Sequence, residues 1–120
     1  NGLRLAVLSA CETGLPGLDN IDEVVSLPIG LLQAGVAGVV SSLWSVDEVS
    51  TMLLLTRFYG LWRKDGLEPA IALHQAQQWM VQTTDGEKAS YCNLTIAKSQ
   101  RDQRTYAHPF HWAAFSYLGI

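Results

Sequence analysis

Two short, nearly unbroken apolar runs stand out in the first half of the chain, at residues 3–10 and 36–43. Parallel strands that helices cover on both faces carry such runs, because neither face meets water. We therefore expect a buried strand at each run. A third strand is expected at residues 112–118, with Gly119 ending it.

Helical periodicity fills most of the chain between these runs, since apolar residues recur there at steps of three and four. Helices are predicted over about residues 22–35, 47–64 and 68–82. Either Ser45 or Asp47 can cap the second helix, and Asp65-Gly66 ends it. The apolar face predicted for this second helix contains Met52, Leu55, Phe58, Tyr59 and Trp62.

Residues 83–106 are polar and contain only two weak apolar islands. Loops this long are uncommon inside a compact domain, so this segment is interpreted as a mobile insertion. The remaining elements alternate between strand and helix. That order favours an α/β fold with a largely parallel sheet, formed by residues 1–120 as one domain.

Composition excludes several classes of function. Apolar residues make up 48% of the chain, which is enough for a core, and the net charge is −3. The basic residues form no stripe, so nucleic-acid binding is not expected. No apolar run is long enough to span a bilayer. Two cysteines are few for a disulfide-stapled secreted domain, so we expect reduced thiols and a cytoplasmic protein, with a Cys11–Cys92 bridge as the open alternative.

Candidate chemistry centres on Cys11, which follows the first predicted strand in the segment Leu8-Ser9-Ala10-Cys11-Glu12-Thr13-Gly14. Sites in open α/β sheets lie beyond the carboxyl ends of strands. A thiol there becomes a good nucleophile when a base is nearby, and a backbone N–H in the turn can stabilise an oxyanion. The competing interpretation is a buried structural cysteine.

Other candidate residues follow the second strand. Trp44 comes directly after it and could wall a substrate pocket, whereas Asp47 and Glu48 are also typical of a helix start. His108 and His111 form a His-x-x-His pair, but such a pair indicates a metal only on a helix or with further ligands. We therefore expect no metal and no cofactor.

Four segments in order resemble the CHAT domain family, whose members are similar in fold to caspases and separases and are often fused to TPR repeats. They are LSACETG at 8–14, PIGLLQAGVAGVVSSLWSVDEVSTMLLLTRFYGLW at 28–62, EPAIALHQAQ at 68–77 and HPFHWAAFSYLG at 108–119. The resemblance implies the C-terminal half of a caspase-like three-layer α/β/α sandwich. About three strands are expected, largely parallel, and the last could be antiparallel.

By the same resemblance, Cys11 is the catalytic residue of a cysteine peptidase that cleaves protein partners. Glu12, Gly14, Trp44, Asp47 and Glu48 are the predicted substrate-pocket residues. The family's catalytic histidine ends the strand before the cysteine strand, so the resemblance places it upstream of this chain. We expect the chain alone to be inactive. The alternative is a non-catalytic protein-interaction module with the same fold.

The predicted partners are therefore a protein substrate or regulatory protein, together with TPR repeats in the same polypeptide. A chain that lacks the histidine strand would leave the apolar strand at 3–10 unpaired on one side. Such an edge is a template for pairing with another chain. We expect the isolated fragment to be a homo-oligomer, most simply a two-fold dimer.

Overall fold

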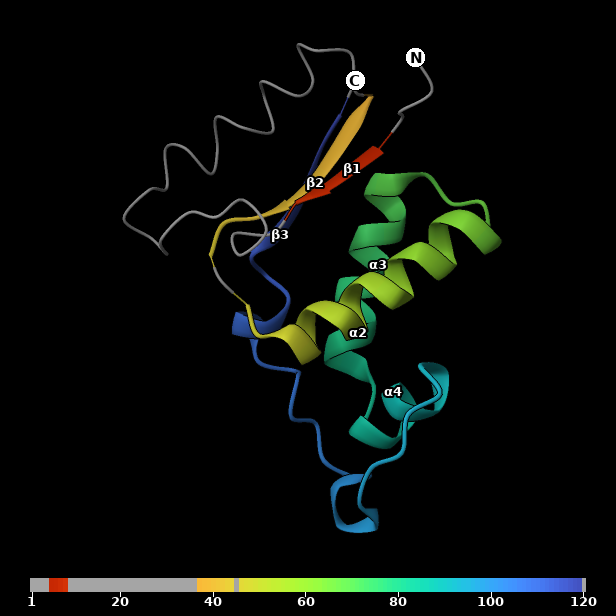
Figure 1. Cartoon of the computed structure of the whole chain (residues 1–120), viewed down its shortest axis with the longest axis vertical. Coiled ribbons are helices and arrows are strands. Elements are labelled where there is room, and N and C mark those ends of the chain that lie inside the picture. The colour runs from red at the N-terminus through yellow and green to blue at the C-terminus, as the bar shows by residue number, and fades with distance from the viewer. Residues whose placement is uncertain (1–4, 9–36, 45, 120) are drawn as a thin grey trace. The chain divides into compact units, whose positions relative to one another are not determined.

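The computed structural model describes residues 5–8, 37–44 and 46–119 of the 120-residue chain, and Figure 1 traces the elements that they form. The chain divides into two compact units. The first comprises residues 1–46 and 114–120, and the second comprises residues 47–113. The described part of the first unit is a β-sheet, whereas the second unit is mainly helical.

Three strands form the sheet of the first unit, in the order β1-β2-β3. The strand β1 (Leu5–Leu8) pairs in parallel with β2 (Gly38–Ser42), and β3 (Phe115–Gly119) pairs antiparallel with β2 on its other side. Every residue of β2 is buried, as expected for the central strand. The two strands predicted from the apolar runs are confirmed, and the last strand is antiparallel.

The third strand begins later than the apolar pattern predicted. A short 3-10 helix, η4 (Pro109–His111), precedes it, and Trp112 and Ala113 both donate their backbone N–H groups to the carbonyl of Pro109. The indole Nε1 of Trp112 donates to the carbonyl of Ala107 at 3.0 Å. Trp112 therefore lies in the turn that follows η4, and its carbonyl accepts from Gln77 Nε2 of α3 at 2.9 Å.

The second unit contains three α-helices. The helix α2 (Glu48–Tyr59) continues into the π-helix η2 (Gly60–Lys64), and α3 (Pro69–Gln82) packs against both. The shorter α4 (Asp85–Tyr91) follows, and a 3-10 turn, η3 (Lys98–Gln100), comes after it. The buried apolar residues of α2, η2 and α3 are Leu53, Leu54, Phe58, Leu61, Ala72, Leu73, Ala76 and Met80.

The predicted boundaries of α2 and α3 are close to those observed, but the predicted buried face of α2 is partly wrong. Met52 is 37% exposed and Tyr59 is 42% exposed, whereas Leu53 and Leu54 are buried. Residues 52–55 are all apolar, so steps of three and four fit more than one face of the helix. Gly66, at φ 73°, takes the left-handed conformation that suits the end of a helix.

Residues 83–106 are not a loop throughout, because α4 occupies part of this segment. A capping box begins the helix: Thr84 Oγ1 accepts from the backbone N–H of Glu87, and a Glu87 carboxylate oxygen accepts from the backbone N–H of Thr84. Asp85, only 3% exposed, accepts from Thr105 N at 3.0 Å and from Gln100 Nε2 at 3.2 Å. These bonds tie the later part of the segment to the start of α4.

Some expectations lie outside the described residues, among them the helix at 22–35 and the glycine-bearing loop before it. None of the helices in the described ranges is long and apolar enough to cross a bilayer. Within the described sheet, β1 has one strand neighbour, β2. Association through the other edge of β1 remains a prediction.

We predict that Gly38→Ala destabilises the sheet. Gly38 pairs with Gly119 across β2 and β3, and a methyl group at either position would overlap the Tyr117 side chain. Overpacking of this kind costs about 1–3 kcal/mol of unfolding free energy. Urea denaturation should show that loss for Gly38→Ala and almost none for Ser116→Ala on the exposed side of β3. In a Tyr117→Ala background the cost should shrink, and an undiminished cost would contradict the overlap.

The mobility of residues 83–106 also remains a prediction, and it centres on the part after α4. Residues 93–95, 97–99 and 101–105 are exposed, so their amides should open easily. Hydrogen exchange should be faster in 93–104 than in 72–80 of α3. Equal protection of the two stretches would show that the Asp85 contacts hold the whole segment.

Candidate active site

The strands β1 and β2 end at the same edge of the sheet. Leu8, the last residue of β1, is paired in parallel register with Ser41 of β2. Cys11 comes three positions after Leu8 in the sequence, and Trp44 comes two positions after the end of β2. Because sites in parallel sheets lie beyond the carboxyl ends of the strands, this edge is the candidate active site.

The structure describes part of the predicted site. Outside the described residues lie Cys11, Glu12 and Gly14. Trp44 is half-buried. Just before it, the backbone N–H of Leu43 donates to the carbonyl of Ala114 at 3.0 Å, which extends the β2–β3 ladder by one residue. The backbone is thus held by the sheet up to the residue that precedes Trp44.

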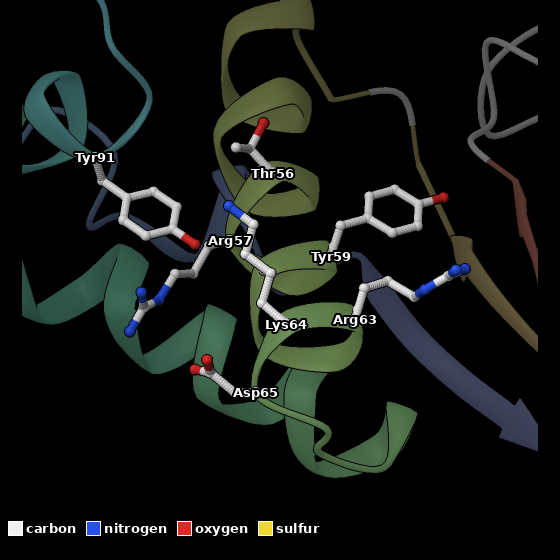
Figure 2. A pocket seen from close by; sticks show the side chains of 8 residues that line it. Thr56, Arg57, Tyr59, Arg63, Lys64, Asp65 and Tyr91 are labelled. Atoms are coloured by element: carbon white, nitrogen blue, oxygen red, sulfur yellow. The ribbon is translucent and has the colours of Figure 1, made fainter.

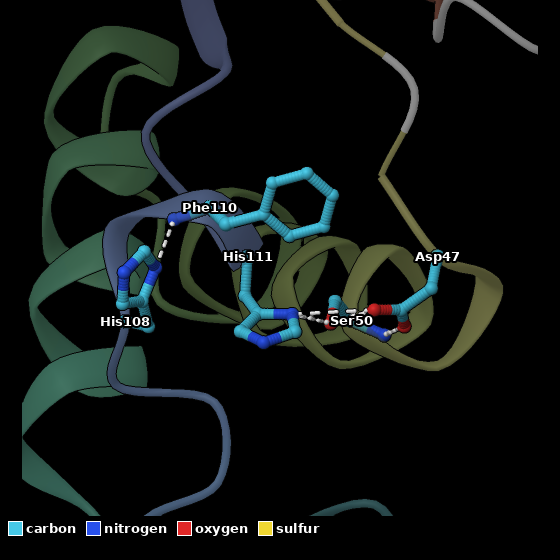
Figure 3. Close-up of polar contacts among 5 residues, drawn as sticks. All are labelled: Asp47, Ser50, His108, Phe110 and His111. Atoms are coloured by element: carbon cyan, nitrogen blue, oxygen red, sulfur yellow. Dashed lines mark hydrogen bonds and ion pairs between the residues drawn. The ribbon is translucent and has the colours of Figure 1, made fainter.

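Asp47 is the N-cap of α2, as predicted. One carboxylate oxygen, Oδ1, accepts from the backbone N–H of Ser50 at 2.8 Å, and the other, Oδ2, accepts from the Ser50 hydroxyl at 3.0 Å. Figure 3 shows this arrangement. Glu48 is exposed in the first turn of α2, where a negative charge is favourable.

His111 joins this cap from 61 residues away in the sequence, and Figure 3 shows its imidazole facing Ser50 and Asp47. Its Nδ1 lies 2.6 Å from Ser50 Oγ and 3.2 Å from Asp47 Oδ2. The Ser50 hydroxyl donates its hydrogen bond to Asp47 Oδ2, so the serine oxygen acts as an acceptor toward His111. The arrangement therefore requires a proton on Nδ1. The rings of Tyr106 and Phe110 meet the imidazole edge-on.

Aspartate, serine and histidine here do not form a catalytic triad. In a triad the acid binds one imidazole nitrogen and the nucleophile binds the other. In this cluster both Ser50 and Asp47 lie at Nδ1 of His111. The Ser50 hydroxyl donates its hydrogen bond to the Asp47 carboxylate, whereas in a triad it would donate to the imidazole. Ser50 is also fully buried. The cluster can hold the turn at His111 against the start of α2, but it cannot generate a nucleophile at Ser50.

The electrostatics of Asp47 fit a structural role. Burial favours the neutral acid and so raises the pKa of Asp47, but the two hydrogen bonds from Ser50 and the neighbouring His111 oppose this effect. Together they hold the pKa of Asp47 below its ordinary value. The carboxylate is therefore ionised at neutral pH.

The two histidines of the His-x-x-His pair make different contacts in the structure. His108 Nδ1 accepts from the backbone N–H of Phe110 at 3.0 Å and so caps η4, whereas His111 binds the cap of α2. Within the described ranges no group of three or more potential metal ligands lies together. The two histidines have separate local roles.

Cys92 is a free thiol at the C-terminal end of α4. It is half-buried, and burial raises the pKa of its thiol. A raised pKa lowers the thiolate fraction at neutral pH, so Cys92 is a poor nucleophile. The reactivity of the Cys92 thiol can therefore be compared with that of Cys11 in the same protein.

Sequence reasoning missed the contact between Ser50 and His111. The N-cap itself had a local signal, because Asp47 precedes an apolar-periodic segment. A side-chain contact between residues 61 positions apart has no periodic or capping pattern. The nearest signal was the family resemblance, which contains both the SVDEVS and the HPFHW segments.

The model of the CHAT domain family matches residues 1–119 of the chain. No curated protein and no solved structure matches the chain. The match includes all predicted site residues, both those that the structure describes and those that it does not.

We predict that Asp47→Ala lowers the unfolding free energy by about 1 kcal/mol, because the N-cap of α2 is lost. Asp47→Asn should cost less, since asparagine can still accept from Ser50 N, but it loses the charge that faces His111. Glu48→Gln is the matched control, because it removes a neighbouring negative charge without touching the cap. Denaturant titration at neutral pH measures all three. An effect of Glu48→Gln as large as that of Asp47→Ala would contradict the assignment.

The pH dependence of Asp47→Asn has a defined sign. The folded pKa of Asp47 lies below its unfolded value. Its stabilising charge is therefore fully present above the unfolded pKa of about 3.9 and is lost as the pH falls through the folded pKa. The difference in stability between the wild type and Asp47→Asn should be larger at pH 7 than at pH 3. A difference that grows on acidification would show that the carboxylate is not stabilised by these contacts.

Proposed function

This chain belongs to the CHAT domain family, and from that premise we propose that it is part of a caspase-like cysteine peptidase with Cys11 as the nucleophile. The family match makes it a peptidase-type domain. The proposal rests on the parallel register of β1 and β2, which end at one edge, and on the place of Cys11 three positions after β1 in the sequence. The three-layer sandwich of that fold is proposed with it.

The proposed reaction is amide hydrolysis through a thioester. The Cys11 thiolate attacks the carbonyl carbon of the scissile peptide bond, and backbone N–H groups in the turn stabilise the oxyanion. As the C–N bond breaks, a histidine gives a proton to the leaving amine. Water, deprotonated by the same histidine, then attacks the thioester, which releases the acid and restores the thiol.

The histidine of the proposed dyad is expected at the end of the strand that precedes the cysteine strand, as the family resemblance implies. The positions of this chain's own histidines support that choice. His74 is exposed on α3, His108 caps η4, and His111 binds Ser50 and Asp47. Each of the latter two already uses Nδ1 in a local contact.

The proposed substrate pocket keeps the residues predicted for it. Trp44 would wall the pocket beside Cys11, and Glu12 and Gly14 would line the turn, where glycine leaves space for a substrate backbone. Asp47 has both carboxylate oxygens in the α2 cap. An exposed carboxylate such as that of Glu48 is freer to meet a basic or polar substrate group.

We predict that Cys11→Ala in the full-length protein abolishes cleavage of a synthetic peptide library, with a fall of at least about 10³-fold in kcat/KM for the preferred peptide. Cys92→Ala is the matched control and should leave kcat/KM unchanged, because that thiol is half-buried and its pKa is raised. Unchanged cleavage by Cys11→Ala would refute the assignment. Absence of cleavage by the wild type, with peptides still bound, would favour the interaction module.

A further inference from the structure

An open pocket of about 710 Å³ lies along the end of α2 and the whole of η2. Its volume is within the range of small-molecule sites, which is roughly 300–1,000 Å³. Figure 2 shows its side chains on two sides of the helix: Arg57, Lys64 and Tyr91 lie together, whereas Tyr59 and Arg63 point the other way. This surface is called the η2 pocket below.

A glycine shapes the floor of the η2 pocket. Thr56, Gly60 and Lys64 follow one another at four-residue steps, and η2 starts at Gly60. A side chain at Gly60 would overlap the hydroxyl of Tyr91, which comes from α4. Glycine therefore lets Tyr91 approach the helix and close one side of the pocket. Short π-helical segments are frequently found at functional sites.

The charge of the η2 pocket is opposite to that of the chain. Arg57, Arg63 and Lys64 line it against a single carboxylate, that of Asp65, in a chain with a net charge of −3. None of the three cations forms an ion pair with another described residue. The negative C-terminal end of the helix favours Arg63 and Lys64. It does not account for Arg57, which lies more than one turn earlier.

Arg57 carries the clearest sign of a missing partner. Its Nε is buried and has no hydrogen-bond partner among the described residues. The guanidinium is held in place by stacking, 4.8 Å from the centre of the Tyr91 ring and 5.7 Å from that of Trp79. An unpaired buried donor costs about 1–3 kcal/mol. The aromatic contacts fix the guanidinium, and its terminal nitrogens are the groups that an oxyanion in the η2 pocket would meet.

We propose that the η2 pocket binds a small molecule carrying two linked phosphate groups. Its lining supplies several hydrogen-bond donors, which are the Arg57 guanidinium, the Lys64 ammonium and the hydroxyls of Thr56 and Tyr91. Guanidinium and ammonium groups bind phosphate through charge-assisted hydrogen bonds. Arg57 and Lys64 bind the phosphate groups on the side of the helix that Tyr91 closes. The pocket is thus a ligand site in addition to the proposed peptidase site.

Isothermal titration calorimetry of the purified protein with sodium pyrophosphate tests this proposal. We expect saturable binding of one pyrophosphate per chain, and a loss of at least about 10-fold in affinity for Arg57→Gln and for Lys64→Gln, because each removes a charge-assisted contact. Lys98→Gln is the matched control. Lys98 is an exposed lysine of η3, outside the pocket, and its loss changes the net charge equally.

The outcomes separate a built site from general charge attraction. No saturable binding, or an equal loss for Lys64→Gln and Lys98→Gln, overturns the proposal. Because Arg57 stacks on aromatic rings, circular dichroism should check that Arg57→Gln still folds. Lys64 is exposed, so Lys64→Gln tests the site without disturbing that packing. If adenosine diphosphate binds as tightly as pyrophosphate, the pocket recognises only the phosphates. If adenosine diphosphate binds more tightly, the pocket also contacts the base. The residues that line the η2 pocket are not among those proposed for the peptidase site, so a failure to bind pyrophosphate leaves the peptidase proposal standing.

Discussion

Parallel pairing of β1 with β2 is the constraint on which the rest of the account depends. Parallel strands cannot be joined by a tight turn, so residues 9–37 must cross from the end of one strand to the start of the next. The register of Leu8 with Ser41 makes both strands end at one edge. Cys11 and Trp44 follow these two strands in the sequence, and we propose that they belong to one site beyond this edge.

The polar cluster in the helical unit shows why residue types alone are a poor guide to chemistry. The cluster has the residue types of a hydrolase triad, namely Asp47, Ser50 and His111. However, the Ser50 hydroxyl donates a hydrogen bond to the Asp47 carboxylate, and Ser50 and Asp47 both contact the same imidazole nitrogen of His111. Ser50 is buried, so no substrate could reach it. The cluster instead caps α2 and fixes the turn before β3. Its role is to hold the helical unit together.

Local patterns in the sequence were sufficient for much of the fold. Apolar runs identified β1 and β2, and Asp47 was among the predicted caps for α2. The helix α4 was missed because it is short and polar, although the Thr84-x-x-Glu87 capping box was present. The buried face of α2 was partly wrong, since four consecutive apolar residues fit several faces.

Contacts between distant residues could not be predicted in the same way. The bond between Ser50 and His111 and the approach of Tyr91 to Gly60 depend on tertiary packing, which leaves no periodic pattern. The candidate active site was found differently, through the position of Cys11 and the family resemblance. The chemistry proposed for it rests on the family match, whereas the η2 pocket follows only from the three-dimensional arrangement of Arg57, Lys64 and Tyr91.

Activation of Cys11 as a nucleophile can be measured through the pH dependence of its alkylation. Iodoacetamide labelling of the full-length protein, followed by mass spectrometry of the two cysteine peptides, gives a separate rate for Cys11 and Cys92. We expect an apparent pKa for Cys11 below the usual thiol value of about 8.5, and slow labelling of Cys92, whose pKa is raised by burial. A Cys11 that titrates like an ordinary thiol, or reacts more slowly than Cys92 at neutral pH, would contradict it.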